Sequence, residues 1–197
     1  LKFRPTLGLE NDIRDCIVWD RNPTHEFSDM NHFILAKELK RLGDNCNCIV
    51  EIGVHRNNEK SSTNTLINEK PSSCLYLGID INDKSYLDDP SNNVYTIKTD
   101  SKNRRLVYEK LKELGVNNID LLFIDGWHSI EYVCDYDWLY TEILSDHGVV
   151  LAHDVSMHPG PYCHYDAVDE KLFDKRKYFT DVCDFGIGVY RRKQIEG

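Results

Sequence analysis

Two short apolar runs separated by a helical pattern limit most strongly what this chain can fold into. The first run covers residues 119–124 and the second covers residues 149–152, and each has the length and the branched side chains of a buried strand. Between them, apolar and aromatic residues from position 130 to position 144 recur at helical spacing. A strand, a helix and a second strand in this order predict the repeating unit of an α/β sheet.

Both apolar runs end on side chains that can carry chemistry. The first run is followed by Asp125 and His128, and the second by His153 and Asp154. Ligands of open α/β sheets bind at the C-terminal ends of the strands. A lone carboxylate such as Asp125 often does no more than cap a helix, but titratable residues at two neighbouring strand ends favour a chemical role.

The rest of the sequence alternates further strands with helices. We expect strands at residues 48–54, 75–81 and 94–99 before the central pair, and at 178–183 and 187–191 after it, the last two joined by a hairpin at 184–186. We expect helices from a cap at Ser28 to Leu42, at residues 63–69 and at residues 106–114. Residues 159–161, Pro-Gly-Pro, are interpreted as a turn in a loop carrying His158, His164 and Tyr165, which are candidate acceptor contacts.

This pattern predicts an α/β fold with a doubly wound, mostly parallel seven-stranded sheet and an antiparallel C-terminal hairpin strand. At 197 residues the chain has the size of a single domain. Within it we expect residues 1–45 to form an N-terminal segment and helix that pack on an α/β core of residues 46–197.

Composition excludes several classes of function. A net charge of −9 argues against binding along a nucleic-acid backbone, which requires a basic face. No apolar run approaches the length of a membrane span, and no signal-peptide pattern is present, so we expect a cytoplasmic protein without membrane contact. Seven scattered cysteines do not form a disulfide framework and are interpreted as free thiols.

Three earlier strand ends carry residues suited to a nucleoside ligand. Gly53 follows the first strand, where a missing Cβ lets the backbone approach a ligand closely. The glycine-rich fingerprint of dinucleotide-binding enzymes is absent, which weakens an NAD-dependent interpretation. Asp80 follows the second strand at a position suited to ribose hydroxyls, and Asp100-Ser101 follow the third, where a base could be held.

Taken together, these motifs resemble the class I S-adenosylmethionine-dependent methyltransferases. The resemblance is to the group of macrolide-sugar O-methyltransferases and cephalosporin-hydroxylase-like proteins, and it covers about residues 46–192. The motifs that carry it are EIGV at 51–54, GID at 78–80, DGWHS at 125–129 and GVVLAHD at 148–154.

The resemblance implies a role for each strand-end residue. The expected cofactor-binding residues are Glu51 and Gly53 at the methionine part, Asp80 at the ribose, and Asp100, Ser101 and Asp125 around the remainder. A divalent metal, Mg or Mn, is expected at Asp125, His153 and Asp154. His128 is expected to be the catalytic base.

Two positions depart from the family pattern. After Gly53 the relatives continue with a glycine pair, whereas this chain has Asn57-Asn58, residues that tolerate positive φ best after glycine. His153 stands where relatives commonly place an acid, and imidazole suits Mn, Fe, Ni or Zn better than Mg. Two alternatives stay open: the metal differs from that of the relatives, or His153 is not a ligand.

The predicted function is therefore metal-assisted O-methyl transfer from S-adenosylmethionine to a hydroxylated small molecule such as a sugar. The alternative is a non-catalytic or differently specific nucleotide-binding protein on the same fold. The expected partner is a small-molecule hydroxyl acceptor, and homo-oligomerisation stays open.

Overall fold

A computed structural model gives the structure of the protein and describes residues 29–54, 61–129, 142–156, 158–179 and 185–194. Several predictions concern positions outside these ranges. They are the N-terminal segment before residue 29, the Asn57-Asn58 turn, the crossover helix over residues 130–141 and the hairpin residue Asp184.

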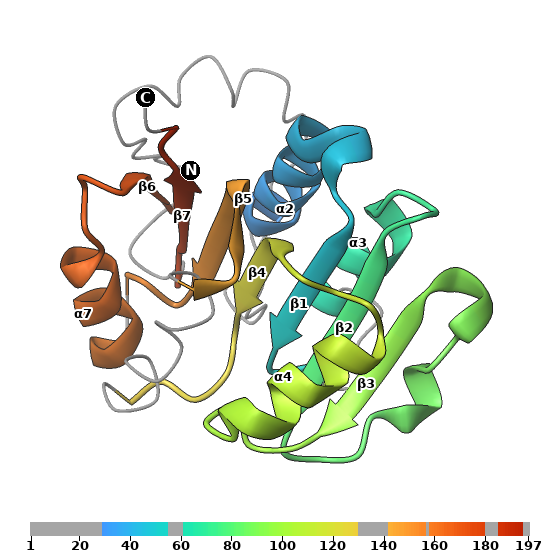
Figure 1. Ribbon diagram of the computed structural model, residues 1–197. Coiled ribbons are helices and arrows are strands. Elements are labelled where there is room, and N and C mark those ends of the chain that lie inside the picture. The colour runs from blue at the N-terminus through green and yellow to red at the C-terminus, as the bar shows by residue number, and fades with distance from the viewer. Residues whose placement is uncertain (1–28, 55–60, 130–141, 157, 180–184, 195–197) are drawn as a thin grey trace.

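A seven-stranded sheet forms the centre of the molecule, in the order β3-β2-β1-β4-β5-β7-β6 (Figure 1). The strands are β1 Cys48–Ile52, β2 Leu75–Asp80, β3 Val94–Lys98, β4 Ile119–Ile124, β5 Leu144–His153, β6 Phe173–Tyr178 and β7 Ile187–Arg192. The first five are parallel to one another, and β7 runs antiparallel between β5 and β6. The predicted mostly parallel sheet with an antiparallel C-terminal hairpin is confirmed.

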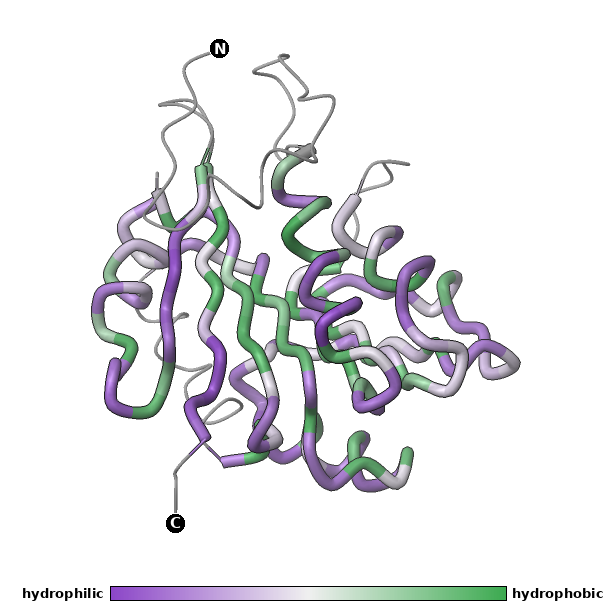
Figure 2. The backbone as a smooth tube through the Cα atoms, turned by 90° about the horizontal axis from the view of Figure 1, so that it is seen from above, coloured by the Kyte–Doolittle hydropathy of each residue, from purple (hydrophilic) through white to green (hydrophobic). Residues whose placement is uncertain are grey.

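Helices cover both faces of this sheet. They are α2 Asp29–Leu42, α3 Ser62–Glu69, α4 Arg104–Glu113 and α7 Pro159–Ala167, with short 3-10 turns η1 Gly43–Asn45, η2 Ser85–Leu87 and η3 Pro90–Asn92. One apolar cluster joins α2 and α3 to one face of the sheet, and a second joins α4 to the other face. Figure 2 shows the hydrophobic colour concentrated along the central strands.

Alternation of side chains along each strand explains the two clusters. Ile49 of β1 lies in the cluster under α2, and its neighbour Val50 lies in the cluster under α4. The central strands are buried on both faces, and for this reason they are near-continuous apolar runs in the sequence.

The structure corrects three boundaries. The strand that pairs with β7 is Phe173–Tyr178, upstream of the predicted 178–183, of which residues 180–183 lie outside the described residues. Its charged middle residues suit an edge strand, where charge discourages pairing with other chains. Leu144, assigned to the crossover helix, pairs with Ile119 at the start of β5. The Pro-Gly-Pro stretch begins helix α7 and is not a turn, because proline is well suited to the first helical positions.

None of the helices in the described part of the chain combines the length and the apolar character needed to cross a membrane.

A buried ion pair ties α2 to the antiparallel side of the sheet. Glu38 is 1% exposed, and its carboxylate accepts hydrogen bonds from Arg191 of β7, one of them from Nε at 3.0 Å. Arg41 donates to the same carboxylate over 2.8 Å. Two guanidinium groups therefore compensate one buried negative charge.

We expect Arg191→Met to destabilise the protein by about 3 kcal/mol, because Glu38 then keeps only the half-exposed Arg41 as a partner. Urea unfolding followed by circular dichroism measures the change. Arg105→Met is the matched control, since Arg105 pairs with Glu109 in solvent and its loss should cost below about 1 kcal/mol. Equal losses of unfolding free energy in the two variants would contradict a stabilising role for the buried Glu38–Arg191 pair.

Candidate active site

The C-terminal ends of the parallel strands meet at one edge of the sheet, and a close backbone contact there joins β1 to β4. Gly53 has φ +86°, and a Cβ at this position would lie 2.0 Å from the carbonyl oxygen of Asp125. The backbone N–H of Asp125 donates to Ile52 over 2.8 Å. Glycine is therefore required at position 53 for the fold itself as well as for any ligand.

Glu51 is fully buried beneath this turn. Its carboxylate accepts hydrogen bonds from Ser62 Oγ at 2.7 Å, Thr63 Oγ1 at 2.8 Å and the Tyr76 hydroxyl. Burial raises the pKa of Glu51 to about 7, although the three hydroxyl donors act in the opposite direction. Glu51 thus anchors the start of α3 to β1 and β2, and its predicted contact with a cofactor stays a prediction.

Asp80 lies at the end of β2 and reaches across to β1. Its Oδ2 accepts from the backbone N–H of Val54 at 3.0 Å, and its Oδ1 accepts from Asn82 at 2.7 Å. Lys84 lies 3.9 Å from Oδ2. Each carboxylate oxygen has further acceptor capacity, so Asp80 can still bind hydroxyl groups of a ligand.

Asp100 and Ser101 follow β3, the outermost parallel strand. Asp100 Oδ1 accepts from the backbone of Lys102 at 2.9 Å, and Ser101 is buried. Both predicted residues therefore lie at the edge formed by the C-terminal ends of the parallel strands. β2 and β1 separate them from the residues that follow β4 and β5.

Asp125, His153 and Asp154 converge between the ends of β4 and β5, with one ligand atom of each within 4.8 Å of the others. His153 is buried, and its Nδ1 lies 3.2 Å from Asp125 Oδ1 and 3.4 Å from Asp154 Oδ1. Burial disfavours the imidazolium, but the two carboxylates outweigh it and raise the pKa of His153 well above its usual value.

The second ring nitrogen of His153 contacts a residue that sequence reasoning missed. Asn31 of α2 places its Nδ2 3.1 Å from His153 Nε2. A signal for Asn31 was present, because it lies on the apolar stripe of α2 together with Ile34 and Leu35 and is buried with them. A buried polar residue on an apolar helix face needs a partner.

Asp154 adopts the left-handed conformation, with φ +65°. Its Oδ2 lies 2.6 Å from His128 Nε2. Burial acts to raise the pKa of Asp154, but the positive His153 and the hydrogen bond from His128 hold it well below its usual value. The same hydrogen bond raises the pKa of His128.

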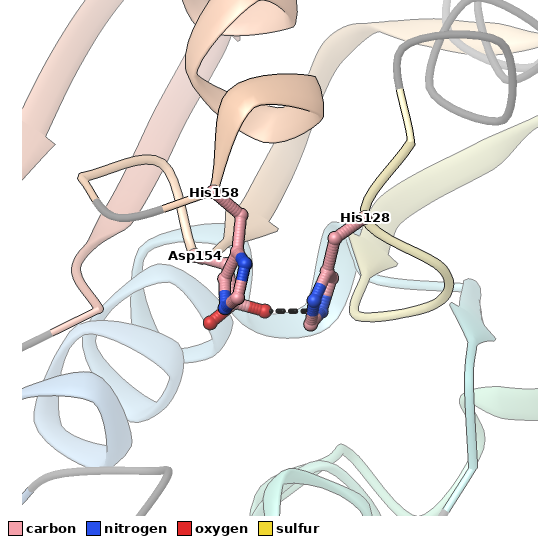
Figure 3. A group of neighbouring side chains, drawn as sticks. All are labelled: His128, Asp154 and His158. Carbon is pink, nitrogen blue, oxygen red and sulfur yellow. Dashed lines mark ion pairs between the residues drawn. The ribbon is translucent and has the colours of Figure 1, made fainter.

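Helix α7 holds the segment that carries His128. The backbone N–H of Gly160 donates to the carbonyl of His128 over 3.2 Å, and a Cβ at Gly160 would lie 2.2 Å from that oxygen. His158, at the N-cap of α7, stacks its ring on His128 with centroids 4.1 Å apart (Figure 3). The predicted base and metal residues therefore form one continuous group.

A pocket opens over this group. Among its lining residues are Trp127, His128, Pro161 and His164, with the Asp125 and Asp154 carboxylates also at its wall. Trp127 is 68% exposed. An exposed tryptophan beside buried charges gives the pocket an apolar contact surface for a ligand.

The donor set of Asp125, His153 and Asp154 fits a divalent metal. His153 Nδ1 and two carboxylate oxygens already point at one another, and a proton on Nδ1 holds them together in the way an ion would. One imidazole and two carboxylates suit Mn²⁺, Fe²⁺ or Zn²⁺ better than Mg²⁺, which prefers oxygen ligands only.

Comparison with known proteins finds similar solved structures but no similar sequence. No family model and no curated protein sequence matches the chain. MycE methyltransferase from the mycinamycin biosynthetic pathway, solved with Mg, S-adenosylhomocysteine (SAH) and mycinamycin VI, superimposes with a TM-score of 0.60 at 15% identity over 82% of this chain. An O-methyltransferase from Bacillus cereus, solved with SAH, gives 0.61 at 14% identity over 87% of this chain and 84% of its own length.

The chain spans about half the length of MycE, 49% of it. At these identities the likeness establishes the architecture, and the protein has the Rossmann-like fold of the class I methyltransferases.

A raised pKa at Glu51 predicts a specific pH dependence of stability. The folded protein keeps a proton on Glu51 between pH 4.5 and about 7 that the unfolded chain has lost, so this group's contribution to the free energy of unfolding falls as pH rises through that window. Relative to Glu51→Gln, the native protein should lose on the order of 3 kcal/mol between pH 4.5 and 7.5. Denaturant unfolding at several pH values measures this difference.

Glu109→Gln, on the exposed face of α4, is the control and should leave the pH profile unchanged. Parallel pH profiles for the native protein and Glu51→Gln would show that Glu51 is ionised throughout.

Proposed function

We propose that the protein transfers a methyl group from S-adenosylmethionine to a hydroxyl of a small molecule, assisted by a divalent metal. The observation that carries this proposal is the convergence of Asp125, His153 and Asp154 with His128 at the ends of β4 and β5. The neighbours of known structure, solved with SAH and in one case Mg, support it.

The cofactor would lie across the ends of β1, β2 and β3. Asp80 is suited to the ribose hydroxyls, since a carboxylate accepts two hydrogen bonds from a diol. Asp100 and Ser101 would face the base, and the Gly53 turn, which packs against the Asp125 backbone, would lie beside the methionine part. Glu51 would act beneath this surface by holding α3 in place.

Asp125, His153 and Asp154 would hold the metal. A bound divalent ion lowers the pKa of an acceptor hydroxyl and fixes its orientation. Asn31, whose amide contacts Nε2, would orient the His153 ring from behind by accepting the Nε2 proton through its amide oxygen, as partners of metal-bound histidines commonly do.

His128 would accept the proton of the acceptor hydroxyl. Its ring is one-third exposed at the wall of the pocket, and Asp154 holds Nε2 in place at 2.6 Å. A histidine in contact with a carboxylate is stabilised as the imidazolium that proton transfer produces. Gly160 fixes its backbone from the opposite side.

The acceptor would be a hydroxylated molecule such as a sugar. MycE was solved with the macrolide mycinamycin VI, and the pocket of this chain places exposed Trp127 next to the candidate base. An aromatic face beside polar groups suits the mixed apolar and hydroxylated surface of a glycoside.

Isothermal titration calorimetry with SAH tests the cofactor assignment directly. SAH should bind and NAD should not, and Asp80→Ala should weaken SAH binding by about 1–3 kcal/mol because charge-assisted hydrogen bonds to the ribose are lost. Asp83→Ala, three residues further on and fully exposed, is the matched control and should bind like the native protein. Unchanged SAH affinity in folded Asp80→Ala would remove Asp80 from the site.

For catalysis, we expect His128→Ala to retain SAH binding and to lose roughly 10²–10⁴-fold in rate, the usual contribution of a positioned base. Glycosides and catechols are first screened for SAH release to find an acceptor. The rate of the native enzyme should fall as pH drops through the raised pKa of His128, and this acidic limb should be absent in the variant.

His147→Ala removes a histidine that pairs with Asp120 away from the site and serves as control. Full activity of His128→Ala would end the assignment.

A further inference from the structure

We propose that His128, His158 and Asp154 form a second metal site, separate from Asp125 and His153, that takes a first-row transition-metal dication such as Zn²⁺. The site lies between the segment after β4 and the start of α7. It requires only the geometry of these three side chains and does not depend on the methyl-transfer proposal.

The three side chains already point at a common space. One ligand atom of each lies within 4.8 Å of the other two. Figure 3 shows the two imidazole rings face to face, with the carboxylate of Asp154 directed at His128. Zn–N and Zn–O bonds of about 2.0–2.1 Å place ligand atoms about 3.3 Å apart in a tetrahedral site. An ion would therefore separate His128 Nε2 and Asp154 Oδ2 slightly from their 2.6 Å contact, with the His158 nitrogen completing the triad.

The backbone fixes the starting positions of all three ligands. The N–H of His158 donates to the carbonyl of Asp154 over 3.2 Å, which holds these two residues one turn apart. Gly160 of the same helix contacts the His128 backbone so closely that a Cβ would clash with it. The rings stack with an angle of 29° between their planes, so little side-chain freedom remains to be lost on binding an ion.

Asp154 can serve both sites because its two oxygens face different neighbours. Oδ1 lies 3.4 Å from His153 Nδ1 in the first site, and Oδ2 lies 2.6 Å from His128 Nε2 in the second. A carboxylate that presents one oxygen to each of two groups is the arrangement found between paired metals in proteins. The second site is thus adjacent to the first and shares a single ligand with it.

The donor types separate the two sites chemically. Two imidazoles and one carboxylate favour Zn²⁺, Co²⁺, Ni²⁺ or Fe²⁺ and disfavour Mg²⁺ and Ca²⁺, whose preferred ligands are oxygens. The first site has the reverse ratio, one imidazole and two carboxylates. His128 is one-third exposed, so an ion can enter from solvent and keep water in its remaining coordination positions.

One consequence rests on the proposed function. A metal bound to one nitrogen of His128 leaves the proton of the neutral ring on the other nitrogen, so the ring can no longer accept the hydroxyl proton, and zinc at the second site should inhibit methyl transfer. If zinc binds but does not inhibit, the proposed function of His128 is contradicted. The binding measurements below test the metal site alone.

The site is tested by titrating the untagged full chain with Co²⁺ and recording visible absorption, because imidazole-bound tetrahedral Co²⁺ is coloured. Isothermal titration calorimetry with Zn²⁺ gives the affinity of the site for zinc. We expect Co²⁺ at the second site to give strong d–d bands, and we expect at least tenfold weaker binding at this site, with loss of the bands, in both His158→Ala and His158→Gln. Asp125→Asn should keep the bands, and Asp154→Asn should lose them.

His147→Ala is the matched control, since His147 also lies 3.1 Å from a carboxylate, that of Asp120, but belongs to neither group of three. It should bind Co²⁺ like the native protein. Circular dichroism and urea unfolding report whether each variant is folded. Unchanged bands in both folded His158 variants, or bands lost in Asp125→Asn and kept in His158→Ala, would overturn the second site.

Discussion

The parallel pairing of β4 with β5 is the constraint on which the rest of the site depends. The register aligns Ile124 with Ala152, so the residues that follow each strand emerge side by side. Neighbouring strands lie about 4.8 Å apart, which is close to the separation of two carboxylates that share one ion. The Gly53 turn then brings the end of β1 against Asp125, and the same edge of the sheet acquires a surface for a second ligand.

Charge balance explains why so many ionisable groups are tolerated in a small buried volume. Asp154 and His153 are almost completely buried, and isolated charges there would be strongly unfavourable. Asp125 and Asp154 raise the pKa of His153, and Asp154 does the same for His128. The positive His153 ring and the hydrogen bond from His128 thus offset the two carboxylates, and a divalent ion could take over the same role.

Sequence reasoning recovered the elements whose signal is local. The central strands are buried on both faces, so their apolar runs and the acids after them located Asp80, Asp125 and Asp154 directly. It failed where tertiary contacts decide. The charged edge strand β6 has no apolar alternation, and no feature of the sequence near Gly160 indicates its close contact with the His128 backbone. The hydroxyl donors to Glu51 come from α3 and β2, and no spacing along the chain reveals such a convergence.

The left-handed backbone at Asp154 restricts which mutations natural drift can sample at that position. Among residues with a side chain, asparagine and aspartate adopt this conformation at the lowest energy, and glycine adopts it freely. Glutamate would carry the same charge but on a backbone conformation that it tolerates poorly. Substitutions that remove the carboxylate here are therefore accommodated most easily as asparagine or glycine.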